Sequence, residues 1–567
     1  MKKLLGAVVV ISLGLLSLPL HALDFSAHGY YRLRLEVSNN LDLQSHASIQ
    51  QGTQGDNDRF GTLFFGQHRF RLEPALKVSD NISFHSQIDF LDNVIFGNND
   101  TRQLKTFSPV VGTIELPDGN GAFGVTGGQG GDVVTGGGGN VNVRRLYVDL
   151  LTPIGKFRLG RQPSHWGLGI FQNDGNAWDS LFGDTFDRFL YIGKYDFKGG
   201  NSSLAFATLV DFAFQNTGDP AIDLLEGPIT GSSHDTYQFT QALVYQRPNF
   251  EIGTYAGFRF RNGTAGTVGT ALRLDDAGNL VPGPGARDGN TETFYIDGYL
   301  KWQKSFITVQ AEYVFLGGNI GTGVCIDAVD TPPGFNSPVP NPICLNGSNK
   351  LATNLAALEV DGKHASDEWK FISGFAQGDS SPLSKRITQF GFRPDYHIGL
   401  LLFQEPLGTS PAIQVNGETK LGNKPITSNF VNNAVYVGTG YKHRFDLSHI
   451  IPQAQWIKVG GHVVTAWAPS RTIDINFAEI TGISTLPRVV NNSSWYGMEF
   501  DLMAEAKFFE HVFWNTTFAF LLPGGVFDIK NDDASNAILP PENPINNIIF
   551  DKANPAFAVR STLMFEF

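Results

Sequence analysis

Charged side chains in this sequence recur at every second position within several long stretches. Arg32 and Arg34 stand two residues apart, and so do Arg69 and Arg71. Residues two apart in an extended strand point to the same face of a sheet, so each pair shares one face. Guanidinium groups stay charged at physiological pH and bind anions through paired N–H groups. Such a face could attract anionic solutes, or it could pair with carboxylates of neighbouring strands.

The opposite face of these stretches is apolar. In residues 250–261, phenylalanine and isoleucine alternate with charged or small residues. This run is about twice as long as a usual strand of a soluble sandwich. It matches the roughly 9–11 residues that a tilted strand needs to cross a bilayer. The same alternation recurs in residues 25–37, 294–303 and 496–507. The pattern predicts strands with one face toward lipid and one toward a polar lumen.

The charged register predicts which residues line that lumen. Both signs occur on it, so two roles are open: pairing between strands, and selection of solutes by charge and size. The candidate lumen-lining residues are Arg32, Arg34, Arg69, Arg71, Arg145, Arg158, Arg259, Arg261, Asp297, Glu312, Glu499 and Asp501.

Short and long connections alternate along the chain, as in outer-membrane barrels with periplasmic turns and extracellular loops. The short turns lie at residues 79–81, 152–155, 247–249, 303–305 and 509–511. Backbone groups in lipid must be paired internally, which excludes an open sheet with free edges. We therefore predict an all-β fold, a closed antiparallel transmembrane β-barrel of about 18 strands over residues 23–567. The parity of residues 386–403 leaves open whether they form a strand.

The first 22 residues have the pattern of a secretory signal peptide. Lys2 and Lys3 precede an apolar run from Leu4 to Leu18 that is short for a membrane-spanning helix. Cleavage after Ala22 would start the mature chain at Leu23. An uncleaved anchor is the alternative.

The last strand alternates as well, and the chain ends on Phe567 in the same register as Phe557, Val559, Leu563 and Phe565. This end resembles the C-terminal signal by which outer-membrane barrels are recognised for assembly. The expected location is the outer membrane of a Gram-negative bacterium. The expected partners are outer-membrane lipid, lipopolysaccharide and the barrel-assembly machinery.

Composition argues against several other classes of protein. The net charge is −12 and no cluster of Lys and Arg occurs, so nucleic-acid binding is not expected. His28, His85 and His462 fall on the inward register, but spacing ties no Ser or Asp to them, so no enzyme is predicted. Residues 127–135 match one calcium-binding nonapeptide, but a second copy is incomplete, so a surface loop is favoured. No metal or cofactor is expected.

Cys325 and Cys344 lie in one Pro- and Gly-rich connection. An exported chain folds in an oxidising compartment, where such a pair can close a loop. The chain-entropy model gives about 3 kcal/mol for a loop of this size. We predict a disulfide, with two free thiols as the alternative; no further Cys or His is spaced to complete a zinc site.

Four short stretches resemble the alginate-export family of outer-membrane barrels and its porin-like relatives. They are residues 157–162, 183–188, 378–379 and 496–502. The resemblance implies a barrel of about 18 strands with an arginine-rich lumen that conducts an acidic polysaccharide. It also implies pore-lining or loop-anchoring roles for Arg158, Arg161 and Asp187, although parity places Arg161 outward unless a bulge or a rim position intervenes.

Because the inward register mixes both signs, the predicted function is diffusion of small polar or anionic solutes through a charged lumen. Export of an acidic polysaccharide is one alternative. A non-conducting barrel used for adhesion, or as a sleeve around a partner, is another. A loop that folds inward, such as residues 166–178, would set the size of the pore.

Overall fold

A computed structural model gives the fold of the chain. The described residues are 23–41, 43, 62–95, 141–214, 236–261, 273–274, 280–281, 291–320, 325–326, 343–344, 349–380, 386–408, 413–415, 418–420, 427–446, 450–470, 473–474, 488–489, 493–528 and 552–567. The signal-peptide residues and the segment 127–135 lie outside them.

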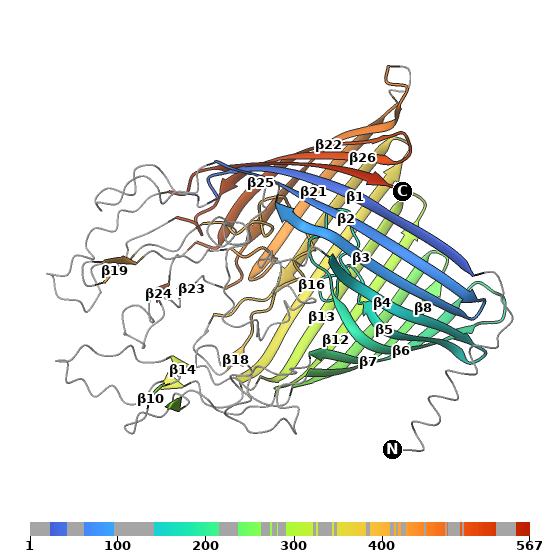
Figure 1. The fold of residues 1–567 in the computed structure, drawn as a ribbon. Coiled ribbons are helices and arrows are strands. Elements are labelled where there is room, and N and C mark those ends of the chain that lie inside the picture. Colours follow the sequence, from blue (N-terminus) through green and yellow to red (C-terminus); the bar gives the residue numbers. More distant parts are fainter. Residues whose placement is uncertain are drawn as a thin grey trace.

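Eighteen long strands of the described chain form one closed antiparallel barrel. Each strand pairs with its neighbour in sequence, and β1 pairs with β27 to close the ring, so blue and red strands meet in Figure 1. The strands are β1 (Asp24–Asn39), β2 (Thr62–Ser79), β3 (Ile82–Ile95), β4 (Val141–Thr152), β5 (Gly155–Pro163), β6 (Thr185–Asp196), β7 (Ser203–Phe214), β8 (Thr236–Arg247), β9 (Phe250–Arg261), β12 (Thr291–Lys304), β13 (Ile307–Ile320), β16 (Asn349–His364), β17 (Asp367–Ala376), β21 (Ala434–Phe445), β22 (Ala454–Trp467), β25 (Trp495–Phe508), β26 (Val512–Pro523) and β27 (Ala556–Glu566). The predicted fold class is confirmed.

The other strands are short. Four pairs of two or three residues each stand apart from the barrel: β10 (Arg273–Leu274) with β11 (Leu280–Val281), β14 (Cys325–Ile326) with β15 (Ile343–Cys344), β19 (Ile413–Val415) with β20 (Glu418–Lys420), and β23 (Ile473–Asp474) with β24 (Arg488–Val489). Among the described residues, none forms a helix with the length and apolar character to span a membrane.

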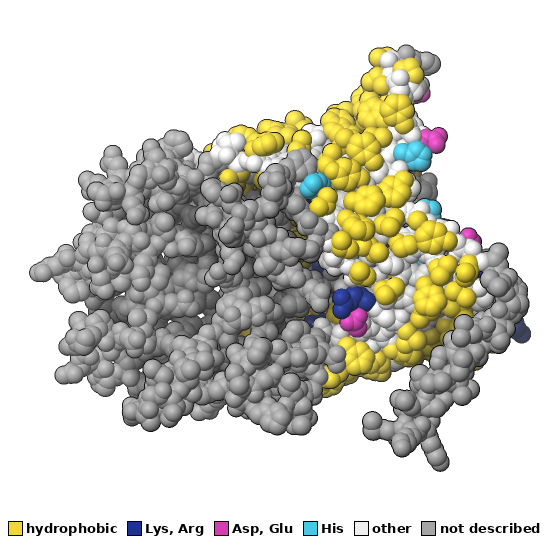
Figure 2. All heavy atoms as spheres, in the orientation of Figure 1, with side chains coloured by type: hydrophobic (Ala, Val, Ile, Leu, Met, Phe, Trp, Pro, Cys, Tyr) yellow, Lys and Arg dark blue, Asp and Glu magenta, His cyan; other side chains and the backbone are white. Residues whose placement is uncertain are grey.

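The outer wall of the barrel is apolar. Ile296, Phe258 and Leu502 point outward and are 53%, 55% and 65% exposed. Figure 2 shows hydrophobic side chains over most of the described outer wall in this view. Alternation along each strand places these residues outward and the charged residues inward. The outer surface therefore has the character that lipid contact requires.

Two connections fold into the lumen. We call residues 164–184, between β5 and β6, the first inner segment, and residues 388–408 with 427–433, before β21, the second inner segment. Ile170 and Leu401 from these segments are fully buried. Tight turns such as residues 80–81 and 153–154 define the turn end of the barrel, and both inner segments are rooted at the opposite, loop end.

The region 386–403 is thus not a barrel strand. Only β18 (Arg386–Ile387) pairs, in parallel with β16, and the chain then turns into the lumen. The four consecutive residues Leu400–Phe403 are 0–6% exposed. Residues 391–400 alternate between buried and part-buried, as a wall strand does, but Leu400–Phe403 are buried in succession because the segment is surrounded on all sides there. This explains why its parity could not be assigned from sequence.

The last residue of the chain pairs with β1 at the closing seam, where β27 and β1 complete the barrel. The backbone N–H and C=O of Phe567 bond to the C=O and N–H of Gly29 on β1, both at 3.1 Å. The Phe567 ring stacks on Phe70 of β2 with centroids 5.6 Å apart. A Cβ at Gly29 would come within 2.7 Å of this ring and 2.2 Å of the Arg71 carbonyl oxygen. The terminal aromatic therefore packs across β1 onto β2.

Replacing Phe567 with alanine should lower the yield of heat-modifiable barrel, because the stacking contact across the seam is lost. Offset-stacked rings contribute about 0.5–1.5 kcal/mol beyond buried area. Semi-native electrophoresis of membrane fractions measures the yield. Phe84→Ala, an outward aromatic of similar exposure on β3, is the control; equal yields from both variants would contradict the seam contact.

The ladder of β14 and β15 places Cys325 opposite Cys344. Opposite residues of an antiparallel pair have Cα atoms about 4.5–5.5 Å apart, inside the range of about 4.4–6.8 Å that a disulfide spans. Their side chains lie outside the described residues, so the bridge remains a prediction. Non-reducing mass spectrometry should find the two cysteines linked in one peptide pair. Two alkylated thiols would contradict it, and a double serine variant should keep the thermal stability of the barrel.

Candidate functional site in the barrel lumen

The first inner segment lies against the arginines of β1 and β2. Arg32 donates hydrogen bonds to the carbonyls of Trp178 and Ser180, at 2.9 and 3.0 Å. Arg34 donates to the carbonyl of Asp179 at 2.6 Å, and Arg69 to that of Ser180 at 3.0 Å. The segment has no partner strand, so the guanidinium groups supply the donors its buried carbonyls require.

The same wall carries its own carboxylates. Arg71 makes a two-bond pair with Asp89, with both N–O distances at 2.7 Å. Arg69 also bonds to Asp92 at 2.5 Å. Arg32 stands directly opposite Arg69 in the ladder, so the arginines do gather on one wall.

These arginines are not on the solute-facing surface of the lumen. Arg32, Arg34, Arg69 and Arg71 are at most 1% exposed because the first inner segment covers them. The sequence analysis expected them to line an open lumen and attract anions. The structure gives them a different position, in which they donate hydrogen bonds to carbonyl oxygens and carboxylates.

Carboxylates of two other wall strands bind the inner segments through their N–H groups. Glu499 of β25 accepts hydrogen bonds from Leu400, Leu401 and Leu402 at 2.6–2.7 Å. Glu312 of β13 accepts from Leu168 at 2.5 Å and from Gly169 at 3.1 Å. Each inner segment is therefore attached at its bend by one buried glutamate.

Glycines permit this close approach. Gly167 has a positive φ of 58°, and a Cβ there would lie 2.5 Å from an oxygen of Glu312. A Cβ at Gly399 would lie 2.5 Å from an oxygen of Glu499. Any larger residue would displace the glutamate from the N–H groups that it binds.

The two inner segments also contact each other and the closing seam. Arg560 of β27 pairs with Glu36 of β1 at 2.7 Å across the seam, and with Glu405 of the second segment at 3.0 Å. Asp395 accepts hydrogen bonds from the N–H groups of Leu181 at 2.9 Å and Phe182 at 3.1 Å. Seam and segments thus share one polar network.

Two acidic side chains of the segments have shifted pKa values. Burial, reinforced by the nearby Glu36, raises the pKa of Glu405 well above its usual value. Burial also raises the pKa of Asp179, but the hydrogen bond and charge of His397, 3.2 Å away, outweigh it, so the pKa is lowered. Asp179 therefore stays ionised while Glu405 favours its protonated form.

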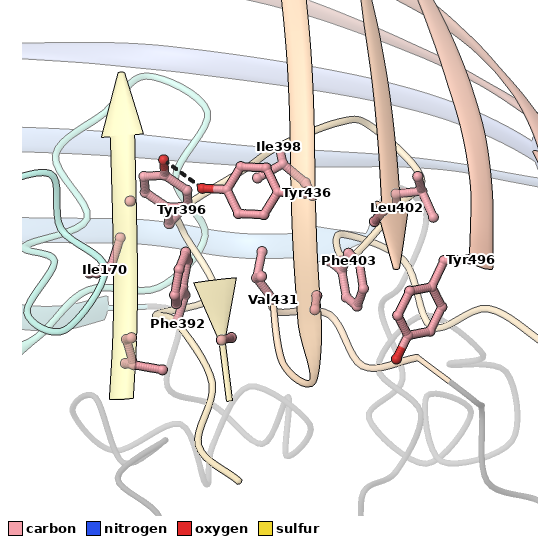
Figure 3. Close-up of a cluster of buried hydrophobic side chains, with 14 of the residues drawn as sticks. Ile170, Phe392, Tyr396, Ile398, Leu402, Phe403, Val431, Tyr436 and Tyr496 are labelled. Atoms are coloured by element: carbon pink, nitrogen blue, oxygen red, sulfur yellow. Dashed lines mark hydrogen bonds between the residues drawn. The ribbon is translucent and has the colours of Figure 1, made fainter. Parts of the chain in front are cut away.

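An apolar core fills the loop-end half of the lumen. Figure 3 shows Tyr396 of the second inner segment facing Tyr436 of β21, with their hydroxyl groups 3.1 Å apart. Phe403 packs edge-on against Tyr496 of β25 at 5.1 Å. Inward residues of the wall here are small or apolar, such as Ala434 at 0% exposure. Hydrophobic burial adds to the polar attachments.

The remaining lumen candidates form local pairs. Arg158 makes a two-bond pair with Asp149, Arg145 donates to the carbonyl of Asp174, and Arg259 donates to Gln238. Asp297 is buried beside Glu312, and Asp501 lies 3.6 Å from His462. The side chain of Arg261 lies outside the described residues.

Arg161 and Asp187 do not reach the lumen. They form a two-bond pair, at 2.9 and 3.0 Å, on the outward register of β5 and β6. The outward neighbours Leu159 and Phe189 are 45% and 38% exposed. The pore-lining role implied by the resemblance is therefore corrected for both residues. Parity gave the right face for Arg161, which needs no bulge to reach its partner.

No catalytic relay forms at the inward histidine of β3. Ser83 lies 3.0 Å and Asp149 3.8 Å from the same ring nitrogen of His85, whereas a relay needs them on opposite nitrogens. Within the described ranges, no three His, Cys, Asp or Glu side chains are grouped so that they could hold a metal ion.

Sequence reasoning missed the residues that join the inner segments, namely Asp395, His397 and Glu405. Apolar residues alternate through Phe392, Tyr396 and Leu400 as they would in a wall strand, so the pattern gave no sign that Asp395 and His397 contact another inner segment. The one available signal was the run Leu400–Phe403, since four consecutive apolar residues in a long connection indicate burial.

Comparisons with known proteins give distant likenesses only. No protein-family model and no curated protein matches the chain. Among solved structures, it is similar to OccK2 (OpdF) of Pseudomonas aeruginosa in complex with glucuronate, with 7% identity, a TM-score of 0.41, and coverage of 96% of this chain and 98% of that one. It is also similar to OpdK of the same organism, with 9% identity, TM-score 0.39 and coverage of 96% and 99%. The chain is also similar to an anion-selective porin from Comamonas acidovorans, with 9% identity, a TM-score of 0.37, and coverage of 96% of this chain and 100% of that one. TM-scores this low carry no argument about function.

Replacing Glu499 with alanine should release the second inner segment, because three buried N–H groups lose their acceptor at about 1–3 kcal/mol each. With Leu401→Cys as reporter and serine at both native cysteines, a membrane-impermeant maleimide should label at least about tenfold faster when Glu499 is replaced. Glu251→Ala, which removes a part-exposed inward carboxylate of β9, is the control. Equal labelling rates in all three backgrounds would contradict the attachment.

Proposed function

We propose that the chain is an outer-membrane channel for passive diffusion of small polar solutes. The observation that supports this most is a closed barrel with an apolar exterior whose turn-end lumen has part-exposed charged side chains. Lys507 is 29% exposed and Glu566 44%. Ionic groups in contact with water inside a lipid-facing barrel are typical of a water-filled passage. The signal-peptide pattern and the terminal Phe567 support a location in the outer membrane.

The inner segments support a narrow passage. They occupy the loop-end half of the lumen with an apolar core, which leaves less cross-section than an empty barrel of this strand number. Export of an acidic polysaccharide would need a wide path with accessible cations. The arginines that could serve it are buried under the first inner segment, so small solutes fit the geometry better.

Weak ion selectivity fits the charges of the turn-end lumen. Lys442 pairs with Glu505 at 2.5 Å and Lys370 with Glu359 at 2.9 Å. Paired groups of opposite sign produce little net field beyond a Debye length of about 8 Å. The proposal therefore drops the preference for anions that the sequence suggested and keeps small polar solutes. Lipopolysaccharide, outer-membrane lipid and the assembly machinery remain the proposed partners.

A non-conducting barrel is the second candidate, because the apolar core in Figure 3 fills part of the lumen. Ion conductance separates the two functions. The purified barrel in planar bilayers should give discrete current steps if a continuous water path exists.

Replacing Arg32 and Arg69 with glutamine should raise the step size, because the first inner segment loses its anchoring donors, while the reversal potential in a salt gradient stays nearly unchanged. Arg161→Gln, which removes an outward arginine, is the control and should match the wild type. A cation-ward shift at constant step size would mean that these arginines face the solute path. Absence of current steps from wild type and variant alike would favour the non-conducting barrel.

A further inference from the structure

We propose that Trp178, Phe513 and Trp456 form a stacking site for the ring of a neutral sugar at the turn end of the lumen. This inference rests on the proposed channel function and specifies one class of solute. Trp178 belongs to the first inner segment, while Phe513 and Trp456 point inward near the turn ends of β26 and β22.

The three rings are contiguous. Trp178 contacts Phe513 edge-on with centroids 5.4 Å apart, and Trp456 lies 6.2 Å from Phe513. In the ladder, Trp456 and Phe513 both stand opposite Lys507 of β25, so the three wall residues form one row. A loop side chain thus completes an aromatic surface that begins on the wall.

These rings differ from the tyrosines of the loop-end core. Tyr255, Tyr295 and Tyr496 are 3–4% exposed and belong to the core that fills the loop-end half. Trp178, Phe513 and Trp456 are only part-buried and lie outside that core. Aromatic surface left in contact with lumen water has an unfavourable hydration free energy. A solute that covers the rings would recover it.

The charged groups beside the rings fit an uncharged, hydroxyl-rich solute. Lys507 pairs with Glu566 at 3.4 Å, and Lys458 pairs with Glu368 at 3.0 Å while lying 4.8 Å above the Trp456 ring. Each ammonium group already has a carboxylate, so the pairs offer donors and acceptors without net charge. Sugar hydroxyls can bond to both groups of a pair, while the C–H face of the ring covers an aromatic side chain.

An acidic solute fits less well. A uronate or an aromatic acid would bring its own carboxylate close to Glu566 and Glu368, and no ammonium group of these pairs is left to neutralise it. Like charges at short range disfavour such binding. This comparison separates a neutral sugar from the anionic solutes that the arginine-rich register first suggested.

The ring from the loop is held in place before any solute arrives. Arg32 donates to the carbonyl of Trp178, and Arg34 donates to that of the next residue, Asp179. Positions fixed in advance reduce the entropy that binding must overcome. The anchoring of the first inner segment therefore also positions the stacking site.

The test is block of the ion current in planar bilayers by maltotriose, with trigalacturonate and benzoate as acidic comparisons. Maltotriose should reduce the current in a saturable manner, and the two acids should do so more weakly at equal concentration. The double variant Trp456→Ala with Phe513→Ala should raise the apparent Kd for maltotriose by about tenfold or more. Trp514→Ala, which removes the outward aromatic next to Phe513, should leave the Kd unchanged.

The outcomes separate this inference from the channel function. A steady current that maltotriose does not block, or blocks equally in the double variant, overturns the sugar site and leaves the channel standing. Stronger block by benzoate or trigalacturonate overturns the neutral-sugar assignment. Absence of any current overturns the proposed function itself. If the double variant fails to assemble, Trp456→Phe and Phe513→Leu, which keep most of the volume, should still weaken the block severalfold, and unchanged block in them overturns the site.

Discussion

Hydrogen bonding of two unpaired backbone segments inside a barrel is the constraint on which the rest of this structure depends. A chain that enters the lumen without joining a sheet must still satisfy its N–H and C=O groups. Here side chains of the wall supply the partners: arginines for the carbonyls of residues 178–181, and glutamates for the N–H groups of residues 168–169 and 400–402. These inward side chains therefore serve to hold the inner segments in place.

This arrangement divides the lumen into two halves that differ in polarity and in contact with solvent. At the loop end, the attached segments and small wall residues build an apolar core. At the turn end, ion pairs and three aromatic rings remain in contact with solvent. Arg560 joins the closing seam, at Glu36, to the second inner segment, at Glu405. Barrel closure and segment docking are therefore coupled through one buried guanidinium group.

The barrel itself could be predicted from the sequence, because alternation, short turns and the terminal Phe567 are local patterns with a direct geometric meaning. The identity of the inward arginines was equally predictable, since parity fixes the face of a strand. What they bind was not, because residues 178–181 are more than a hundred positions away from Arg32 and lack any periodic pattern. Arg161 is a similar case. Parity placed it correctly on the outward face, whereas the family resemblance suggested that it lines the pore. Asp395 and Glu405 had no local signal that marked them as contacts between segments.

Both inner segments are docked in the lumen by buried arginine and glutamate side chains of the wall. Site-resolved hydrogen–deuterium exchange of the intact barrel in lipid nanodiscs tests this docking most directly. The amides of Leu168, Leu400, Leu401 and Leu402 should then exchange nearly as slowly as those of the adjacent wall strands β13 and β25. Exchange of these four amides at the rate of an unprotected, solvated backbone would contradict it.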